Sequence, residues 1–223
     1  MRWLAERPLL AAWTSLACGS LRAPLAAAAL ALACSTPGGA PVQHSVRDPG
    51  GFTITEKVRV GGEARADFER GVQVLQQDRV GEGIALLERA TEAAPNLTAA
   101  WIDLGIARAR AGELEGAAAS LEKARELAPG HPVVHNELGI LYRRMGRFED
   151  ARRSYQKALE LYPDFHFARR NLAILCDLYL GDVGCAIDNY AVYLQAVTDD
   201  AEAAIWIDDL RAQSGAAQSN EKE

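Results

Sequence analysis

A 34-residue period runs through the middle of this 223-residue chain and limits what the chain can fold into. Three sets of residues keep this spacing: Pro95, Pro129 and Pro163; Leu104, Leu138 and Leu172; and Ala90, Ala124 and Ala158. A repeat of this length indicates a linear array of small structural units, each packed only against its neighbours. No single unit of this size can bury its own apolar face, so the units are expected to stack.

Each repeat contains two stretches whose apolar residues recur with a spacing near 3.6, which predicts a pair of amphipathic helices. Gly71, Gly105 and Gly139 recur at the position where the two helices of a pair would approach most closely. The recurring proline follows the second helix and ends it, because proline cannot continue a helix. The expected fold class is therefore all-α, built from helical hairpins.

The pattern resembles the tetratricopeptide repeat, with the family's spacing W-x2-L-G-x2-Y, then A-x3-F, then P. The clearest copies are "WIDLGIARARAGELEGAAASLEKARELAP" and "HNELGILYRRMGRFEDARRSYQKALELYP". The first departs from the pattern at Arg108, where the family has Tyr. The resemblance implies a superhelical solenoid over residues 63–198, with four hairpins. Their approximate bounds are 64–97, 98–131, 132–165 and 166–199.

Two irregularities mark the C-terminal part of the array. Gly181 lies one residue later than Gly112 and Gly146 predict, so we expect one inserted residue in the turn of the fourth hairpin. The final proline is replaced by "VTDD", and residues 200–213 are predicted to form an amphipathic capping helix, which a stack needs for solubility. Residues 214–223 are predicted to be a disordered tail.

The N-terminus is predicted to be a targeting segment. Residues 1–33 carry three arginines before an apolar run from Pro24 to Ala33, which is too short to span a bilayer and is typical of a signal peptide. Small residues directly before Cys34 resemble a bacterial lipobox. That resemblance implies cleavage after Ala33, lipidation of Cys34 and, with Ser35 following, transport to the outer membrane facing the periplasm.

The lipobox departs from its usual form, because Ala31 stands where Leu is expected and Cys18 is a weaker competing site. Plain secretion into the periplasm and a leader retained in the membrane therefore stay open as alternatives. Residues 34–62, which are rich in Gly, Pro and Ser at their start, are predicted to be a flexible tether. Within it, "GFTITEKVRVGG" alternates apolar residues and is either an extended segment docked on the repeats or an ordered linker.

Cys176 and Cys185 fall late in the first helix and early in the second helix of the fourth hairpin. Antiparallel helices bring such positions side by side, at a Cα separation compatible with a disulfide. An exported chain would meet oxidising conditions, and the bridge would then form. Two buried thiols, or a redox or metal pair, remain alternatives, although the eight residues between the cysteines do not fit a thioredoxin-like centre.

Catalytic and cofactor motifs are scarce. No phosphate-binding loop, nucleophile elbow or paired CxxC motif occurs, and the net charge of −6 without a basic block disfavours nucleic acid as a partner. His131 and His135 have a metal-like spacing, but both fall at structural positions of the repeat. We therefore expect no enzyme activity, no cofactor, no metal and no small-molecule substrate.

The resemblance places the binding surface in a groove lined by the first helix of each hairpin. The family's ligand-contacting positions correspond here to an aliphatic row with polar residues near one end. They are Phe68, Val72, Ile102, Ile106, Asn136, Ile140, Arg143, Arg144, Arg170, Asn171 and Ile174. An alternative is that the isoleucines belong to the core and the arginines to a solvated face. The arginines and asparagines favour a peptide with an acidic or C-terminal carboxylate group.

The expected function is a non-catalytic scaffold: a membrane-anchored periplasmic adaptor that binds peptide segments of protein partners during assembly of an envelope complex. Its architecture is similar to that of pilotin-type and gliding-motility lipoproteins with tetratricopeptide repeats, and pilus, motility or TonB/ExbB-type complexes are the candidate settings. Two alternatives remain. The first is an adaptor that regulates a cell-wall hydrolase, and the second is a cytosolic adaptor with a mis-assigned start.

Overall fold

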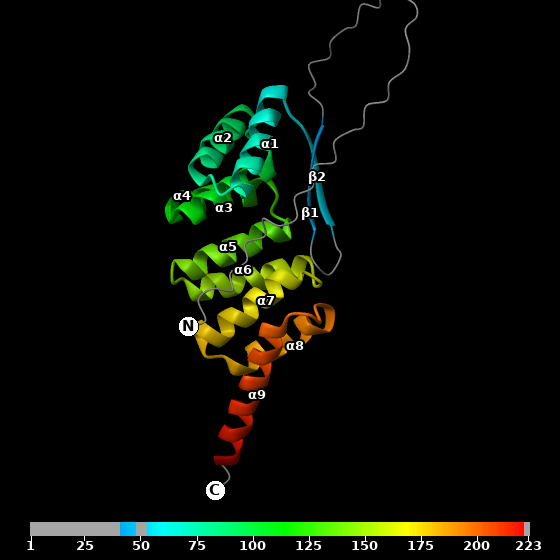
Figure 1. Ribbon diagram of the computed structural model, residues 1–223, viewed down its shortest axis with the longest axis vertical. Helices are drawn as coiled ribbons and strands as arrows, with labels where there is room; N and C mark the ends of the chain where they lie inside the picture. Colours follow the sequence, from blue (N-terminus) through cyan, green and yellow to red (C-terminus); the bar gives the residue numbers. More distant parts are fainter. Residues whose placement is uncertain (1–40, 48–52, 221–223) are drawn as a thin grey trace, which may run out of the picture.

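Helical hairpins stacked one on another form the body of the protein (Figure 1). The computed structural model describes residues 41–47 and 53–220. The predicted signal peptide and the lipid-anchor residue, Cys34, lie outside these residues. The hairpins are α1 (Gly62–Gln76) with α2 (Val80–Ala93), α3 (Thr98–Ala111) with α4 (Leu114–Leu127), α5 (Pro132–Arg144) with α6 (Phe148–Leu161), and α7 (His166–Leu175) with α8 (Val183–Ala196). The predicted all-α solenoid of four hairpins and a final helix is confirmed.

The repeated glycines are explained by close approach of the two helices within a hairpin. A Cβ atom on Gly139 of α5 would lie 2.5 Å from a ring carbon of Tyr155 in α6. A Cβ atom on Gly105 of α3 would lie 2.6 Å from Leu121 in α4. Tyr155 and Leu121 are fully buried, so the small residue is what allows a large side chain at the opposite position.

A second repeated contact fixes the junction between hairpins. The Nε1–H of Trp101 donates to the carbonyl oxygen of Pro95 at 2.9 Å. One repeat later, Nε2 of His135 lies 2.8 Å from the carbonyl oxygen of Pro129. In the next repeat Arg169 donates to the carbonyl oxygen of Pro163 at 2.8 Å. Three different side chains therefore make the same contact with the carbonyl oxygen of the proline six positions earlier in the chain.

The inserted residue of the fourth hairpin is not in the inter-helix turn, where the sequence pattern placed it. Instead, α7 continues into a π-helical turn, η1 (Cys176–Leu180), before Gly181 adopts a left-handed conformation with φ of 63°. The widened turn takes up the extra residue inside the helix, as π-bulges do. The connection to α8 consequently stays as short as the one between α3 and α4.

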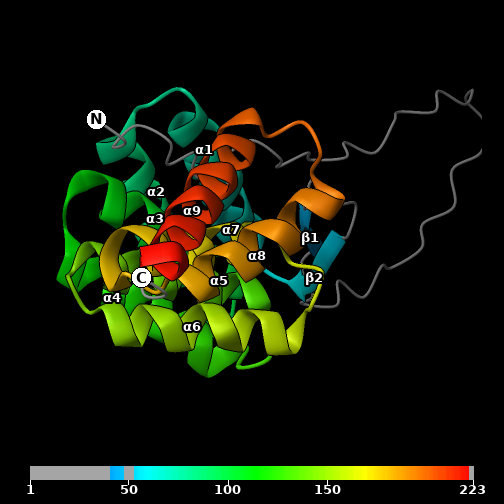
Figure 2. The same cartoon turned by 90° about the horizontal axis from the view of Figure 1, so that it is seen from below.

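The predicted flexible tether, residues 34–62, contains regular structure that the sequence pattern revealed only in part. Strands β1 (Pro41–Arg47) and β2 (Thr53–Arg59) pair antiparallel, with Val42 opposite Val58 and Val46 opposite Ile54. The extended second strand follows from its alternating β-branched residues. Figures 1 and 2 show the hairpin along one flank of the stack. Val60, which follows β2, is buried against α1.

The last helix is longer than predicted. Helix α9 spans Ala201–Asn220, whereas the sequence predicted a helix over 200–213 and a disordered tail from residue 214. Ala203, Ile207 and Leu210 of this helix are buried, and residues 211–215 are exposed or half-buried. The favourable helix propensity of alanine and glutamine in "AQSGAAQ" accounts for the extension. Across the described residues, no helix is both long enough and apolar enough to cross a membrane.

Candidate peptide-binding surface

The inner face is the surface formed by the first helices of the four hairpins, α1, α3, α5 and α7, each of which packs on the next. The predicted aliphatic row contains both buried and half-buried side chains on this face. Phe68 and Ile102 are buried in the core, 4% and 1% exposed, as the core alternative expected. Ile106 and Ile174 are nearly buried as well. Val72 and Ile140 are half-buried, so they are the apolar members that a ligand can reach.

The arginines of the inner face contact other parts of the protein. Arg110 of α3 donates to Asp78 Oδ1 at 2.7 Å and to the Leu75 carbonyl oxygen at 3.3 Å, both at the end of α1. Arg144 of α5 makes the equivalent contact one repeat later, at 2.6 Å to the Ala109 carbonyl oxygen at the end of α3. These arginines stabilise the C-terminal ends of the preceding inner helices, where cations are favoured.

Arg143 and Arg170 are also engaged. Arg143 is 5% exposed, with its guanidinium 5.6 Å from the centre of the Tyr179 ring. Arg170 donates from Nε to Asp200 Oδ2 at 2.9 Å and lies over the Trp206 ring, which ties α7 to the capping helix. The Asp200 carboxylate also accepts hydrogen bonds from the Tyr193 hydroxyl at 2.9 Å and from the Ala203 backbone N–H at 3.0 Å. The expectation of a carboxylate-binding cluster is therefore not supported by these arginines.

The two predicted asparagines bind each other. The Asn171 amide donates to Asn136 Oδ1 at 3.0 Å, and the Asn136 amide donates to Glu137 Oε1 at 3.0 Å. Asn136 is completely buried and Asn171 is half-buried. This chain of hydrogen bonds links α7 to α5 and satisfies polar groups that burial would otherwise leave unpaired.

Two buried acids lie on the inner face and were not singled out from the sequence. Asp103 of α3 and Glu137 of α5 are 2% and 8% exposed, and they occupy the same position in successive repeats. Burial raises the pKa of Asp103 well above its usual range, and the charge of Glu137 raises it further. Burial raises the pKa of Glu137 to about 7, against the lowering effect of the Asn136 hydrogen bond. The sequence could have indicated these two acids, because they occupy the sixth position of the repeat. That position contacts ligands in the family, and Asn171 occupies it in the fourth repeat.

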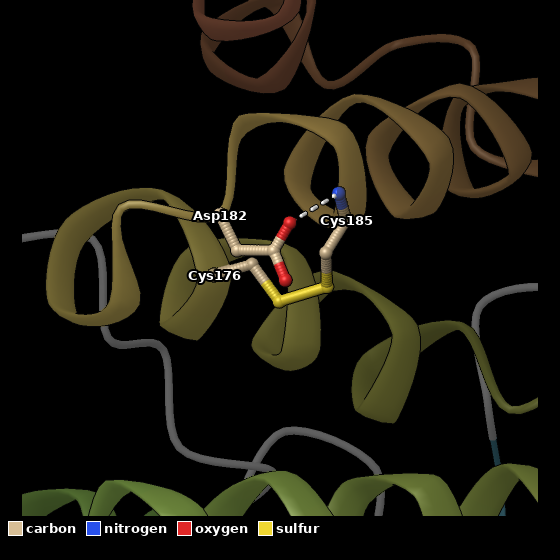
Figure 3. Close-up of side chains that lie close together, drawn as sticks. All are labelled: Cys176, Asp182 and Cys185. Carbon is tan, nitrogen blue, oxygen red and sulfur yellow. Dashed lines mark hydrogen bonds between the residues drawn. A yellow bond between two sulfur atoms is a disulfide. The ribbon is translucent and has the colours of Figure 1, made fainter.

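The structure joins Cys176 and Cys185 by a disulfide, with a Cα separation of 5.9 Å (Figure 3). Asp182 begins α8 beside them, and its Oδ1 accepts the Cys185 backbone N–H at 3.1 Å. In the described part of the chain, the side chains of these three residues lie close enough together to be considered as ligands of one metal ion. A metal would need both sulfurs as thiolates, whereas here they are bonded to each other.

Of the two histidines, His135 has a structural partner. Nε2 of His135 makes a hydrogen bond with the Pro129 carbonyl oxygen. Trp101 makes the equivalent hydrogen bond with Pro95 one repeat earlier. Burial lowers the pKa of His131 to about 4, with a smaller contribution from His135. His131 directly precedes α5, in the turn between hairpins.

Comparisons with known proteins agree with this architecture. Two family models, both described as tetratricopeptide repeat, match residues 97–164 and 136–201. The repeats over residues 97–201 are therefore tetratricopeptide repeats, a class whose members are generally non-catalytic interaction scaffolds. No curated protein matches the chain.

Among solved structures, the chain is similar to one described as "Functional Characterization of Pseudomonas Aeruginosa pilF". The identity is 21%, the TM-score is 0.63, and the match covers 68% of this chain and 69% of that one. A crystal structure of MamA protein matches with 19% identity and a TM-score of 0.62, over 72% of this chain and 87% of that chain. The first TPR of Spaghetti (RPAP3) bound to the HSP90 peptide SRMEEVD matches with 20% identity and a TM-score of 0.50, over 52% of this chain and 91% of that chain. At these identities the similarity shows the fold alone.

Proposed function

We propose that this protein is a non-catalytic scaffold that binds peptide segments of partner proteins on its inner face. The observation that carries the proposal is the half-buried pair of Val72 on α1 and Ile140 on α5, which leaves apolar surface within reach of a ligand on the first and third inner helices. A peptide laid along such a surface would bury apolar area and orient through nearby polar groups. The similar RPAP3 domain is described as peptide-bound, which supports this mode of binding.

The proposed setting is the bacterial envelope, with the solenoid anchored to the outer membrane through lipidated Cys34 and facing the periplasm. The signal-like N-terminus supports this placement, and so does the disulfide, because oxidising compartments are where such bonds persist. The role we propose in this setting is assembly of an envelope complex, and the similarity to the solved pilF structure, at 21% identity, supports the shared fold alone.

The anchor is tested by the intact mass of the protein extracted from its native membranes, before and after reduction. A chain that begins at Cys34 with added acyl mass, and that gains about two daltons on reduction, supports the proposed placement. A chain that keeps residues 1–33 and has free thiols contradicts both the anchor and the bridge.

The scaffold role is tested by site-specific photo-crosslinking in the native cell. A photoreactive residue at position 72 or 140 should capture a partner protein, because both positions are reachable on the inner face. Position 157, an exposed lysine on α6, is the matched control on a second helix. Capture of an envelope-assembly protein from 72 and 140 alone supports the proposal, and capture of a cell-wall hydrolase would replace assembly with enzyme regulation. Equal capture from position 157, or none from the inner face, contradicts peptide binding there.

A further inference from the structure

Asp103 is a buried acid without a partner. Both of its carboxylate oxygens are shielded from solvent, and neither makes a hydrogen bond. A carboxylate removed from water without hydrogen bonds is strongly destabilising, and buried charges in proteins are normally paired or bound to a cation. A folded protein that keeps such a group at the centre of a binding face therefore gives a reason to look for the missing partner in a ligand.

The environment of Asp103 adds negative charge instead of neutralising it. Among the described residues, the charged group that acts on Asp103 is Glu137, which is an acid on the neighbouring helix α5. Glu137 itself is held by one hydrogen bond, from the amide of Asn136. Two cations of the inner face are committed elsewhere, since Arg110 pairs with Asp78 and Arg170 pairs with Asp200. Neither of these two arginines is therefore the partner of the acid pair.

We propose that Asp103 and Glu137 form a subsite for a lysine or arginine side chain of the bound peptide. The oxygens of Asp103 are shielded in the unbound protein, so a guanidinium or ammonium group would have to enter between α3 and α5 to donate to them and to share the second oxygen of Glu137. Charge-assisted hydrogen bonds of this kind are among the strongest in proteins. This inference rests on the proposed function, and it reverses the charge preference that the arginines in the sequence had suggested.

An apolar position beside the acid pair fits the same ligand. The half-buried Ile140 lies one turn beyond Glu137 on α5. The methylene stem of a lysine or arginine packs well on aliphatic side chains while its charged end is hydrogen-bonded. The ligand is therefore expected to be a peptide with one basic residue.

The direct test is selection of random 12-residue peptides displayed on phage against the full mature chain, followed by titration with one synthetic peptide from the selected set. We expect the selected peptides to share one Lys or Arg. Replacing that residue by norleucine, which keeps the stem and removes the charge, should weaken binding by about tenfold or more.

Matched protein variants separate a ligand role from a structural one. Asp103→Asn and Glu137→Gln keep the shape of the side chain and should weaken binding of the basic peptide by about tenfold, with little effect on the norleucine peptide. Asp103→Asn should leave the unfolding midpoint equal or higher, because an unpaired buried acid does not stabilise the fold. The control is Asp188→Asn on the exposed side of α8, which should bind as the wild type does.

Each outcome has a definite meaning. Selected peptides without a shared basic residue, or unchanged affinity in Asp103→Asn, would overturn the subsite and leave peptide binding intact. A lower unfolding midpoint for Asp103→Asn with unchanged affinity would assign the acids a structural role. Failure to select any binding peptide would contradict the proposed function itself, and the subsite with it.

Discussion

At the residue scale, one position of the repeat connects neighbouring hairpins through different side chains. Arg108 of α3 donates to Glu88 Oε1 at 2.7 Å, and Tyr142 of α5 donates to Glu122 Oε1 at 2.6 Å. Each bond ties a hairpin to the second helix of the hairpin before it. In the fourth repeat the same position is Cys176, which is bonded to Cys185 within its own hairpin. Arginine therefore replaces the family's tyrosine without loss of the contact.

The close approach at Gly139 predicts the effect of adding one methyl group. Alanine is the better helix former by about 1 kcal/mol, but its Cβ would lie 2.5 Å from the ring of the fully buried Tyr155. Overpacking of this kind costs about 1–3 kcal/mol, so Gly139→Ala should lower the free energy of unfolding. Urea denaturation followed by circular dichroism measures the change.

The control for this prediction is Gly130→Ala. A Cβ atom at Gly130 would meet nothing within 4 Å, and the residue lies in the turn before α5. Its effect should stay within about 0.5 kcal/mol. Equal midpoints for the two variants would show that Tyr155 moves aside, contrary to the prediction.

The buried Glu137 predicts a pH dependence of stability. Burial raises the pKa of Glu137 in the folded protein to about 7, whereas an exposed glutamate titrates near about 4.3. The folded protein therefore holds a proton that the unfolded chain loses between these values. The free energy of unfolding should fall as the pH rises through this window and level off above it. The raised pKa of Asp103 acts in the same direction.

Urea midpoints measured from pH 4 to pH 8 test this dependence. Glu137→Gln should flatten the fall, because the variant has no proton to lose at this position. Asp188→Asn, on the exposed side of α8, should follow the wild type. A wild-type midpoint that rises with pH over the same range, and a Gln variant that rises with it, would contradict the prediction.

The sequence indicated which residues lie on the inner face, but it did not indicate which residues form ion pairs with them. The family's ligand-contacting positions, carried over through the 34-residue register, placed Val72 and Ile140 on one helix face. The sequence could not show that Arg110 pairs with Asp78 or that Arg170 pairs with Asp200, since those partners come from different hairpins and from the irregular C-terminus. The same limit concealed the isolation of Asp103, which is a property of its surroundings.

At the element scale, the fourth hairpin departs from the other three. Its first helix ends in the π-helical turn η1, and the disulfide crosses from the first residue of that turn to the first turn of α8. The register of the prolines and glycines predicted one extra residue but not its location, because a loop and a widened helical turn produce the same shift in sequence. The backbone N–H of Asp182 donates to the Cys176 carbonyl oxygen at 2.9 Å and closes the turn.

The disulfide is predicted to stabilise this element. On the chain-entropy model, closing a loop with a sequence separation of 9 contributes about 2–3 kcal/mol. Reduction with dithiothreitol should therefore lower the urea midpoint and speed amide hydrogen exchange in α8. The variant with Cys176→Ala and Cys185→Ala should not respond to reductant. An unchanged wild-type midpoint after complete reduction would show that packing alone holds the hairpin.

At the scale of the whole molecule, the stack has two different ends. The N-terminal end continues into the β1–β2 hairpin through the buried Val60, and the C-terminal end is covered by α9 (Figure 1). Asp200 fixes the position of α9. Although burial raises its pKa, the backbone N–H of Ala203, the Tyr193 hydroxyl and Arg170 together lower it. Capping was predictable from the amphipathic pattern, whereas the use of Arg170 and Tyr193 as its anchors was not.

The cap predicts a local loss of stability when it is removed. In a solenoid, stability comes from each repeat and from its contacts with the next, so damage at one end is felt most by its neighbour. Deleting residues 201–223 removes Ala203, Ile207 and Leu210 from the last part of the core. Amide hydrogen exchange should therefore speed up by about tenfold or more in α7 and α8, with little change in α1 and α2. Deleting only residues 214–223 should leave exchange in α7 and α8 unchanged, because it keeps the buried side chains of Ala203, Ile207 and Leu210. Equal loss of protection in all four hairpins would instead mean that the stack unfolds as one cooperative unit.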